Sequence, residues 1–102
     1  MFKAIVVDDE AMIRTGISSF INNSDVGFEV IKTFKDGSEA MDFLEENSAD
    51  LVITDIKMVN VSGIELAQYI YENKPWIKVI LLSGYAEFEY AKAAINTTWR
   101  NI

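Results

Sequence analysis

Cysteine and histidine are absent from the 102-residue sequence, and proline occurs only once. Without cysteine or histidine the chain has no disulfide, no thiolate nucleophile, no histidine base and none of the usual zinc ligands. Any chemistry must therefore rest on carboxylates and hydroxyls. The scarcity of proline, together with a hydrophobic content of 50%, argues against disorder and predicts a single domain with one packed core.

Positive charge is also scarce, because nine lysines and arginines stand against 16 aspartates and glutamates, for a net charge of -7. A chain of this charge repels nucleic-acid phosphates and anionic lipid surfaces. We therefore expect no direct binding to nucleic acid and no membrane association, whereas cations and basic partner surfaces are favoured. The apolar run before Asp8 is too short for a signal peptide or a membrane span, so we expect a cytoplasmic protein.

Short apolar runs and helical spacings alternate along the chain. Runs at 4–7, 51–53 and 79–82 lack polar alternation and predict strands buried on both faces, whereas the mixed polarity of 28–34 is typical of an edge strand. Four amphipathic helices are predicted from the apolar sets Ile13, Ile17, Phe20 and Ile21; Ala40, Met41 and Leu44; Leu66, Ala67 and Ile70; and Phe88, Ala91 and Ile95.

Capping residues place the starts of the two middle helices. Asp36, before Gly37 and Ser38, opens the second helix, which should end near Asn47, and Ser62 can cap the third. A fourth helix is predicted at about 86–95. The resulting order βαβαβαβα predicts an α/β fold, with a doubly wound parallel sheet covered by helices on both faces.

Oxygen-bearing side chains stand at the carboxyl ends of three predicted strands. Asp8 and Asp9 follow the first strand, Asp55 the third, and Ser83 the fourth. These ends form the ligand crevice of an open parallel sheet, so the four side chains should converge there. Crowded carboxylates repel one another unless a cation compensates, and an all-oxygen set suits Mg²⁺. The sequence therefore predicts a magnesium site.

Each of these residues alone has a simpler interpretation. Asp8 and Asp9 can serve the start of a helix, Asp55 can be a turn residue, and a serine followed by glycine is an ordinary loop pair. Three independent strand ends that carry compatible oxygen groups favour a functional site instead.

The sequence resembles the receiver domains of two-component response regulators. The similar blocks appear in the family's order and span most of the chain: Ile5–Glu10, Asp50–Met58, Ser62–Leu66 and Leu81–Tyr85. The segment Ser83–Ala91 is particularly similar to receivers that precede AraC-type DNA-binding domains. The resemblance implies a flavodoxin-like fold with the strand order 2-1-3-4-5.

The resemblance also implies roles for individual residues. Asp55 corresponds to the phosphoacceptor, and Asp8 and Asp9 to the acidic pair that holds Mg²⁺ together with it. The backbone carbonyl of Lys57 would complete the metal shell, and the Ser83 hydroxyl would sense the phosphoryl group. A sensor histidine kinase would supply that group, and a shift of the loop after the fourth strand and of the fourth helix would control an output domain of transcriptional kind.

The C-terminus departs from the family's pattern. Receivers continue past Ile95 into a fifth strand, a lysine at its end and a fifth helix, none of which is recognisable here. We therefore expect a receiver domain at 1–95, truncated before the fifth strand and fifth helix, and an atypical tail at 96–102. Loss of the fifth strand would turn the apolar fourth strand into an edge, so we expect a homodimer or larger self-association.

Two alternatives stay open. A pseudo-receiver would act as a phosphorylation-independent interaction module, which the missing lysine and C-terminal elements favour. A Mg²⁺-dependent phosphatase with an aspartyl nucleophile would carry a second aspartate two residues further on, where this chain has Lys57. A receiver, by contrast, is no enzyme beyond its own phosphotransfer and dephosphorylation.

Overall fold

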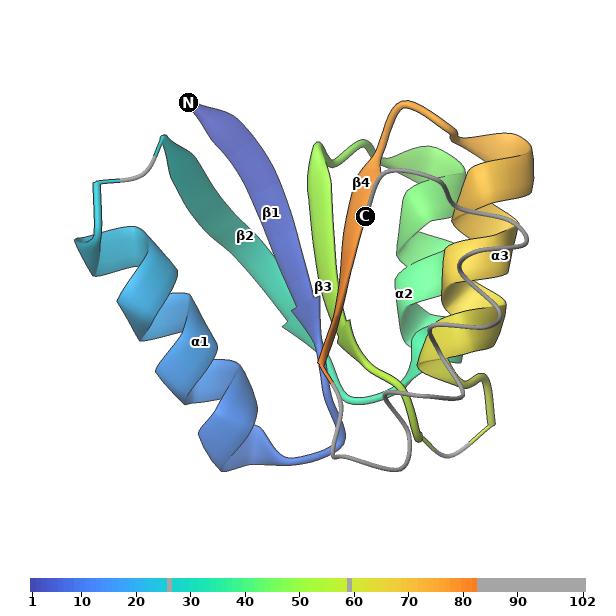
Figure 1. Ribbon diagram of the computed structural model, residues 1–102, viewed down its shortest axis with the longest axis horizontal. Coiled ribbons are helices and arrows are strands. Elements are labelled where there is room, and N and C mark those ends of the chain that lie inside the picture. Colours follow the sequence, from blue (N-terminus) through green and yellow to red (C-terminus); the bar gives the residue numbers. More distant parts are fainter. Residues whose placement is uncertain (26, 59, 83–102) are drawn as a thin grey trace.

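The computed structural model describes residues 1–25, 27–58 and 60–82. Within them, strands and helices alternate along the chain (Figure 1). The elements are β1 (Phe2–Val7), α1 (Ala11–Asn23), β2 (Phe28–Phe34), α2 (Gly37–Glu46), β3 (Leu51–Asp55), α3 (Gly63–Asn73) and β4 (Lys78–Leu82). The predicted helix at 86–95, the tail at 96–102 and Ser83 lie outside the described residues.

The four described strands form one parallel sheet in the order β2-β1-β3-β4. Helix α1 covers one face of this sheet, and α2 and α3 cover the other (Figure 1). The doubly wound parallel architecture is therefore confirmed, and so is the implied strand order for these four strands. Among the described residues, no helix has both the length and the apolar character that a bilayer span requires.

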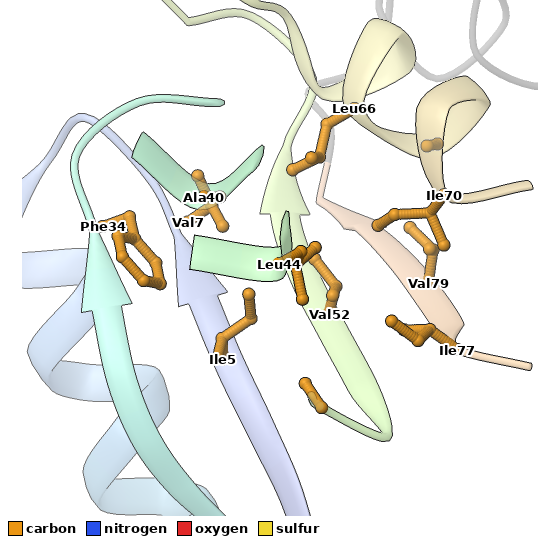
Figure 2. Packing of buried hydrophobic residues seen from close by; sticks show 12 residues of the cluster. Ile5, Val7, Phe34, Ala40, Leu44, Val52, Leu66, Ile70, Ile77 and Val79 are labelled. Carbon is orange, nitrogen blue, oxygen red and sulfur yellow. The ribbon is translucent and has the colours of Figure 1, made fainter. Parts of the chain in front are cut away.

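The larger part of the core lies between the sheet and the pair α2 and α3 (Figure 2). Its strand side chains alternate with those that point to the opposite face, as a pleated strand requires. This layer is built chiefly from Ile5, Val7, Val52 and Val79 of the strands, Leu44 of α2, and Leu66 and Ile70 of α3. Burial of each large side chain contributes about 1.5–3 kcal/mol, so the layer fixes both helices on the sheet.

The starts of α2 and α3 are fixed by the predicted caps. The side chain of Asp36 accepts a hydrogen bond from the Glu39 N–H at 2.9 Å. The Ser62 hydroxyl accepts one from the Glu65 N–H at 3.1 Å, and the Glu65 carboxylate accepts the Ser62 N–H at 3.0 Å. This reciprocal capping box satisfies two helix donors at once. Both helices therefore begin at defined residues beside the carboxyl ends of the strands.

The α1 face of the sheet is covered less completely than the sequence predicts. Ile21 is buried and Ile17 half-buried, but Phe20 is 71% exposed. Phe20 borders an apolar groove of about 370 Å³ between α1 and the strands. Its lining is Ile17, Phe20, Ile21, Phe28, Leu51, Ile53, Ile80 and Leu82. No described element covers this groove, so the inward face of α1 is only partly buried.

Strand β4 also differs from the prediction of a strand buried on both faces. Val79 is buried beneath α3, whereas Ile80, which points the other way, is 46% exposed. The alternation arises because only one face of β4 is covered within the described residues. Continuous Val, Ile and Leu in a strand therefore did not guarantee two covered faces here.

Candidate metal centre

The strand register brings two carboxylates from distant parts of the sequence to the same edge. Val7, the last residue of β1, pairs with Thr54 of β3. The residues that follow, Asp8 and Asp55, therefore lie side by side at the carboxyl ends of the two central strands. Asp55 is itself the last residue of β3, where it pairs with Leu82 of β4.

Asp8 is held in one orientation from several sides. Its side chain is only 2% exposed, and its Oδ1 accepts the Glu10 N–H at 2.9 Å. Its own N–H donates to the carbonyl oxygen of Phe34 at 3.0 Å. Arg14 of α1 donates from Nη1 to the Asp8 carbonyl oxygen at 2.6 Å. Hydrogen bonds thus connect the end of β1 to β2 and to α1, and the Glu10 N–H orients the Asp8 carboxylate.

Asp55 is half-buried, and its local backbone sets its side-chain orientation. Its Oδ1 accepts the N–H of Ile56 at 2.8 Å. The hydroxyl of the preceding residue, the fully buried Thr54, donates to the Asp55 carbonyl oxygen at 3.0 Å. These two local hydrogen bonds hold the end of β3 and fix the position of Oδ1 of Asp55.

Asp9 joins the two other carboxylates to form a three-residue acidic cluster. One carboxylate oxygen from each of Asp8, Asp9 and Asp55 lies within 4.8 Å of the others. Around a single Mg²⁺, with oxygens at about 2.1 Å, neighbouring ligands are about 3–4 Å apart. Asp9 is exposed and can close that small difference by a side-chain rotation. The donor set and its spacing therefore fit a hard divalent cation.

The electrostatics at Asp8 and Asp55 favour protonation or a bound cation. Burial raises the pKa of Asp8, and the neighbouring Asp9 raises it further, against the lowering effect of the Glu10 N–H. Burial likewise raises the pKa of Asp55, with the charge of Asp8 as the next cause. A divalent cation would reverse both effects by favouring the ionised forms. The site is therefore strained electrostatically without one.

The structure brings together three of the five predicted site residues. Asp8, Asp9 and Asp55 meet as described. Lys57 is exposed and lies two residues beyond Asp55, and its carbonyl as a metal ligand stays a prediction. Ser83 lies outside the described residues. Arg14 was not predicted as a residue of the site, because its only signal in the sequence is a lone arginine one helical turn after Glu10.

Comparison with known proteins identifies similar chains. Residues 4–101 match the response regulator receiver domain family. The chain is 42% identical over 96 residues to the transcriptional regulatory protein HptR of Staphylococcus aureus, and 40% identical over 96 residues to an uncharacterized response regulatory protein of Staphylococcus epidermidis. These alignments cover 94% of the chain but only 37% and 38% of the two relatives. The chain thus spans well under half the length of these relatives.

Solved structures with the same architecture agree with this match. A two component transcriptional regulator AraC from Clostridium phytofermentans superposes with a TM-score of 0.87 at 34% identity, covering 100% of this chain and 78% of that one. The REC domain of AraT, a response regulator from Geobacillus stearothermophilus, superposes with a TM-score of 0.83 at 35% identity, covering 93% and 74%. Both similarities extend over most of this chain.

The raised pKa of Asp8 gives a testable pH dependence. The folded chain holds this proton to a higher pH than the unfolded chain, so stability falls as the pH rises through the raised pKa. Asp8→Asn keeps the acceptor for the Glu10 N–H and removes the charge. In metal-free buffer it should raise the melting temperature at pH 7 by a few degrees and lose this advantage at acidic pH.

Thermal unfolding at several pH values measures the effect. Asp42→Asn, at an exposed position on α2, is the matched control and should change the melting temperature little. An Asp8→Asn variant no more stable than the control at pH 7 would contradict the electrostatic account.

Proposed function

Because the chain belongs to the response regulator receiver domain family, we propose that it accepts a phosphoryl group on Asp55 from a sensor histidine kinase. The observation that carries the proposal is the acidic cluster, in which oxygens of Asp8, Asp9 and Asp55 lie within 4.8 Å of one another. Asp55 is the member that ends the central strand β3. It therefore lies at the sheet edge where open parallel sheets bind their ligands, with Asp8 and Asp9 as acidic neighbours.

The chemistry requires little beyond positioning and charge neutralisation. An Asp55 carboxylate oxygen attacks phosphorus, a new phosphorus–oxygen bond forms, and the bond to the donor breaks with its electron pair leaving on the donor. The Ile56 N–H holds Oδ1 of Asp55, so Oδ2 is the oxygen we assign to the attack. Mg²⁺, held by Asp8, Asp9, Asp55 and the Lys57 carbonyl, would supply the positive charge that neutralises the phosphoryl oxygens.

The wider role follows from the relatives. HptR is named a transcriptional regulatory protein, and this chain corresponds to 37% of its length. We propose that phosphorylation controls an output domain of that kind, through the Ser83 hydroxyl and the segment after β4. Location in the cytoplasm and the absence of direct nucleic-acid contacts by this chain belong to the same proposal, the latter supported by its net charge of -7.

The competing functions have weaker support. A receiver that acts without phosphorylation has no need of three carboxylates gathered at one point, and their mutual repulsion would be a cost without a purpose. A phosphatase with an aspartyl nucleophile would require a second aspartate where Lys57 stands. The acidic cluster therefore favours the phosphoacceptor over both alternatives.

Phosphorylation is tested directly by intact mass spectrometry after incubation with acetyl phosphate and Mg²⁺. We expect one phosphoryl adduct on the unmodified sequence, none on Asp55→Asn, and none when Mg²⁺ is chelated. Asp42→Asn, at an exposed position on α2, should still form the adduct. An adduct that persists on Asp55→Asn would refute the assignment.

The metal site is tested by comparing two adjacent acidic residues. Asp9 contributes to the acidic cluster, whereas Glu10 stands at the N-cap position of α1 and donates only its backbone N–H to Asp8. Asp9→Ala should weaken Mg²⁺ binding at least about tenfold, and Glu10→Ala much less. Isothermal titration calorimetry with Mg²⁺ measures both, and equal affinities of the two variants would contradict the proposed ligand set.

Self-association through β4 is the remaining part of the proposal. Within the described sheet β4 is an outer strand, and its residues Val79–Leu82 carry no charge, proline or bulge that would protect an edge. Ile80 of β4 and Phe20 of α1 are both exposed and line the apolar groove. Such an edge is a template for pairing with another copy, while the alternative is a monomer in which residues 96–102 fold over this edge.

Light scattering over a wide protein concentration range distinguishes the two states. We expect a dimer or larger species that Ile80→Lys shifts toward monomer, because a charge protects a strand edge. Met12→Lys, at an exposed position on α1, is the matched control and should leave the assembly unchanged. A monomer at every concentration would rule out the self-association.

A further inference from the structure

The loop that follows Asp55 packs against the first residue of α3 through a glycine. Gly63 donates its N–H to the carbonyl oxygen of Ile56 at 2.7 Å. A β-carbon built on Gly63 would lie 2.8 Å from the carbonyl carbon of Asp55 and 3.0 Å from the Cα of Ile56. The first distance is shorter than real β-carbon contacts, and the second is tighter than nearly all of them. The backbone of α3 therefore lies directly on the backbone of Asp55.

The same loop packs against the first residue of α2 through a second glycine. A β-carbon on Gly37 would lie 2.5 Å from the carbonyl oxygen of Val61, 2.9 Å from its Cγ1 and 3.0 Å from its Cβ. Val61 stands two residues before α3. Any side chain at Gly37 must therefore displace Val61, and with it the start of α3 that rests on Asp55.

The two helices cannot easily move apart to absorb such a displacement. Their starts are fixed by the caps at Asp36 and Ser62. Further along, the Tyr69 hydroxyl of α3 donates to the Glu45 carboxylate of α2 at 2.6 Å. Burial and the hydrogen bond to the Glu45 carboxylate raise the pKa of Tyr69 to about 12, so the hydroxyl remains a donor well above neutral pH. Because this hydrogen bond and the shared core layer oppose a separation of α2 from α3, we expect a side chain at Gly37 to displace the loop.

We propose that Gly37 is a positioning residue for the phosphorylation site, acting on Asp55 through Val61, the start of α3 and Gly63. Because Gly37 has no side chain, the loop can take the position in which Asp55 accepts the phosphoryl group and the Lys57 carbonyl binds Mg²⁺. This role rests on the proposed function of Asp55. The contacts of Gly37 with Val61 and of Gly63 with Asp55 are independent of that function. Gly37 thus has a role at the site, although it neither binds the metal nor touches the phosphoryl group.

A purely structural role is the competing explanation. In that case Gly37 serves only dense packing between α2 and the loop, and a side chain there costs stability without changing the site. Both explanations predict that Gly37→Ala unfolds more easily. Only the positioning role predicts an altered site in protein that is still folded.

The experiment compares Gly37→Ala with two control variants. Gly16→Ala, in α1, introduces the same methyl group where a β-carbon meets nothing within 4 Å. Ile77→Val lowers stability from a buried core position just before β4, at the amino ends of the strands, whereas Asp55 lies at their carboxyl ends. The readouts are the rate constant of phosphorylation by acetyl phosphate at saturating Mg²⁺ and the backbone amide NMR signals of Asp55 and Ile56. Circular dichroism first establishes that each variant is folded.

We expect Gly37→Ala to slow phosphorylation about tenfold or more, as small displacements of a reacting group do, and to shift both amide signals. Gly16→Ala and Ile77→Val should keep the original rate and signals. Unchanged rate and signals in Gly37→Ala, or equal slowing in Ile77→Val, would overturn the positioning role.

Two further experimental outcomes would also test the positioning role of Gly37. If Gly37→Ala does not fold, Val61→Ile enlarges the other partner of the same contact more gently and should give the same changes in smaller measure; no change would overturn the inference. If the original chain accepts no phosphoryl group, the proposed function fails, and the amide signals alone decide whether Gly37 positions the loop.

Discussion

The parallel pairing of β1 with β3 is the constraint on which the candidate site depends. Val7 is aligned with Thr54, so the next residues, Asp8 and Asp55, meet although 46 residues separate them in the sequence. A slip of one residue would turn the alternating side chains of one strand to the wrong face, and both faces of these strands are buried. The core therefore fixes the register, and the register places the carboxylates.

Gathering three carboxylates conflicts with the stability of the metal-free fold. Asp8 is almost completely buried, and the pKa values of Asp8 and Asp55 are both raised, chiefly by burial. The surrounding hydrogen bonds offset the burial of the Asp8 charge only in part, because Arg14 donates to the Asp8 backbone oxygen and not to its carboxylate. Such a cluster is expected where function requires it, because nothing in the packing does.

Sequence patterns predicted the parts of this structure that depend on local chemistry. The predicted bounds of β2 and the predicted caps at Asp36 and Ser62 agree with the structure. Strand polarity and helix capping depend only on residues that are neighbours in the sequence. The meeting of Asp8, Asp9 and Asp55 was also predictable, since the strand ends of a parallel sheet share one edge.

The parts that were wrong or missed depend on what lies opposite each residue. Phe20 and Ile80 carry the pattern of buried residues, yet both are exposed beside an apolar groove. Their burial depends on a covering element and not on their own spacing. Gly37 looks like an ordinary helix start in the sequence, and its contact with Val61 appears only once α2 and the loop are placed in space.

The helices contribute to the same edge through their dipoles, but their contribution is small. In this topology α1, α2 and α3 all begin where the strands end, so their positive ends lie toward the edge that holds the acidic cluster. Each such end contributes about 0.3–1 kcal/mol at an exposed site, and the effect falls off within one turn. Opposite unit charges about 4 Å apart attract by about 4 kcal/mol near a protein surface, so a divalent cation outweighs the dipoles several-fold. The fold therefore prepares this edge for negative charge, and a bound cation would stabilise the ionised forms of Asp8 and Asp55 there.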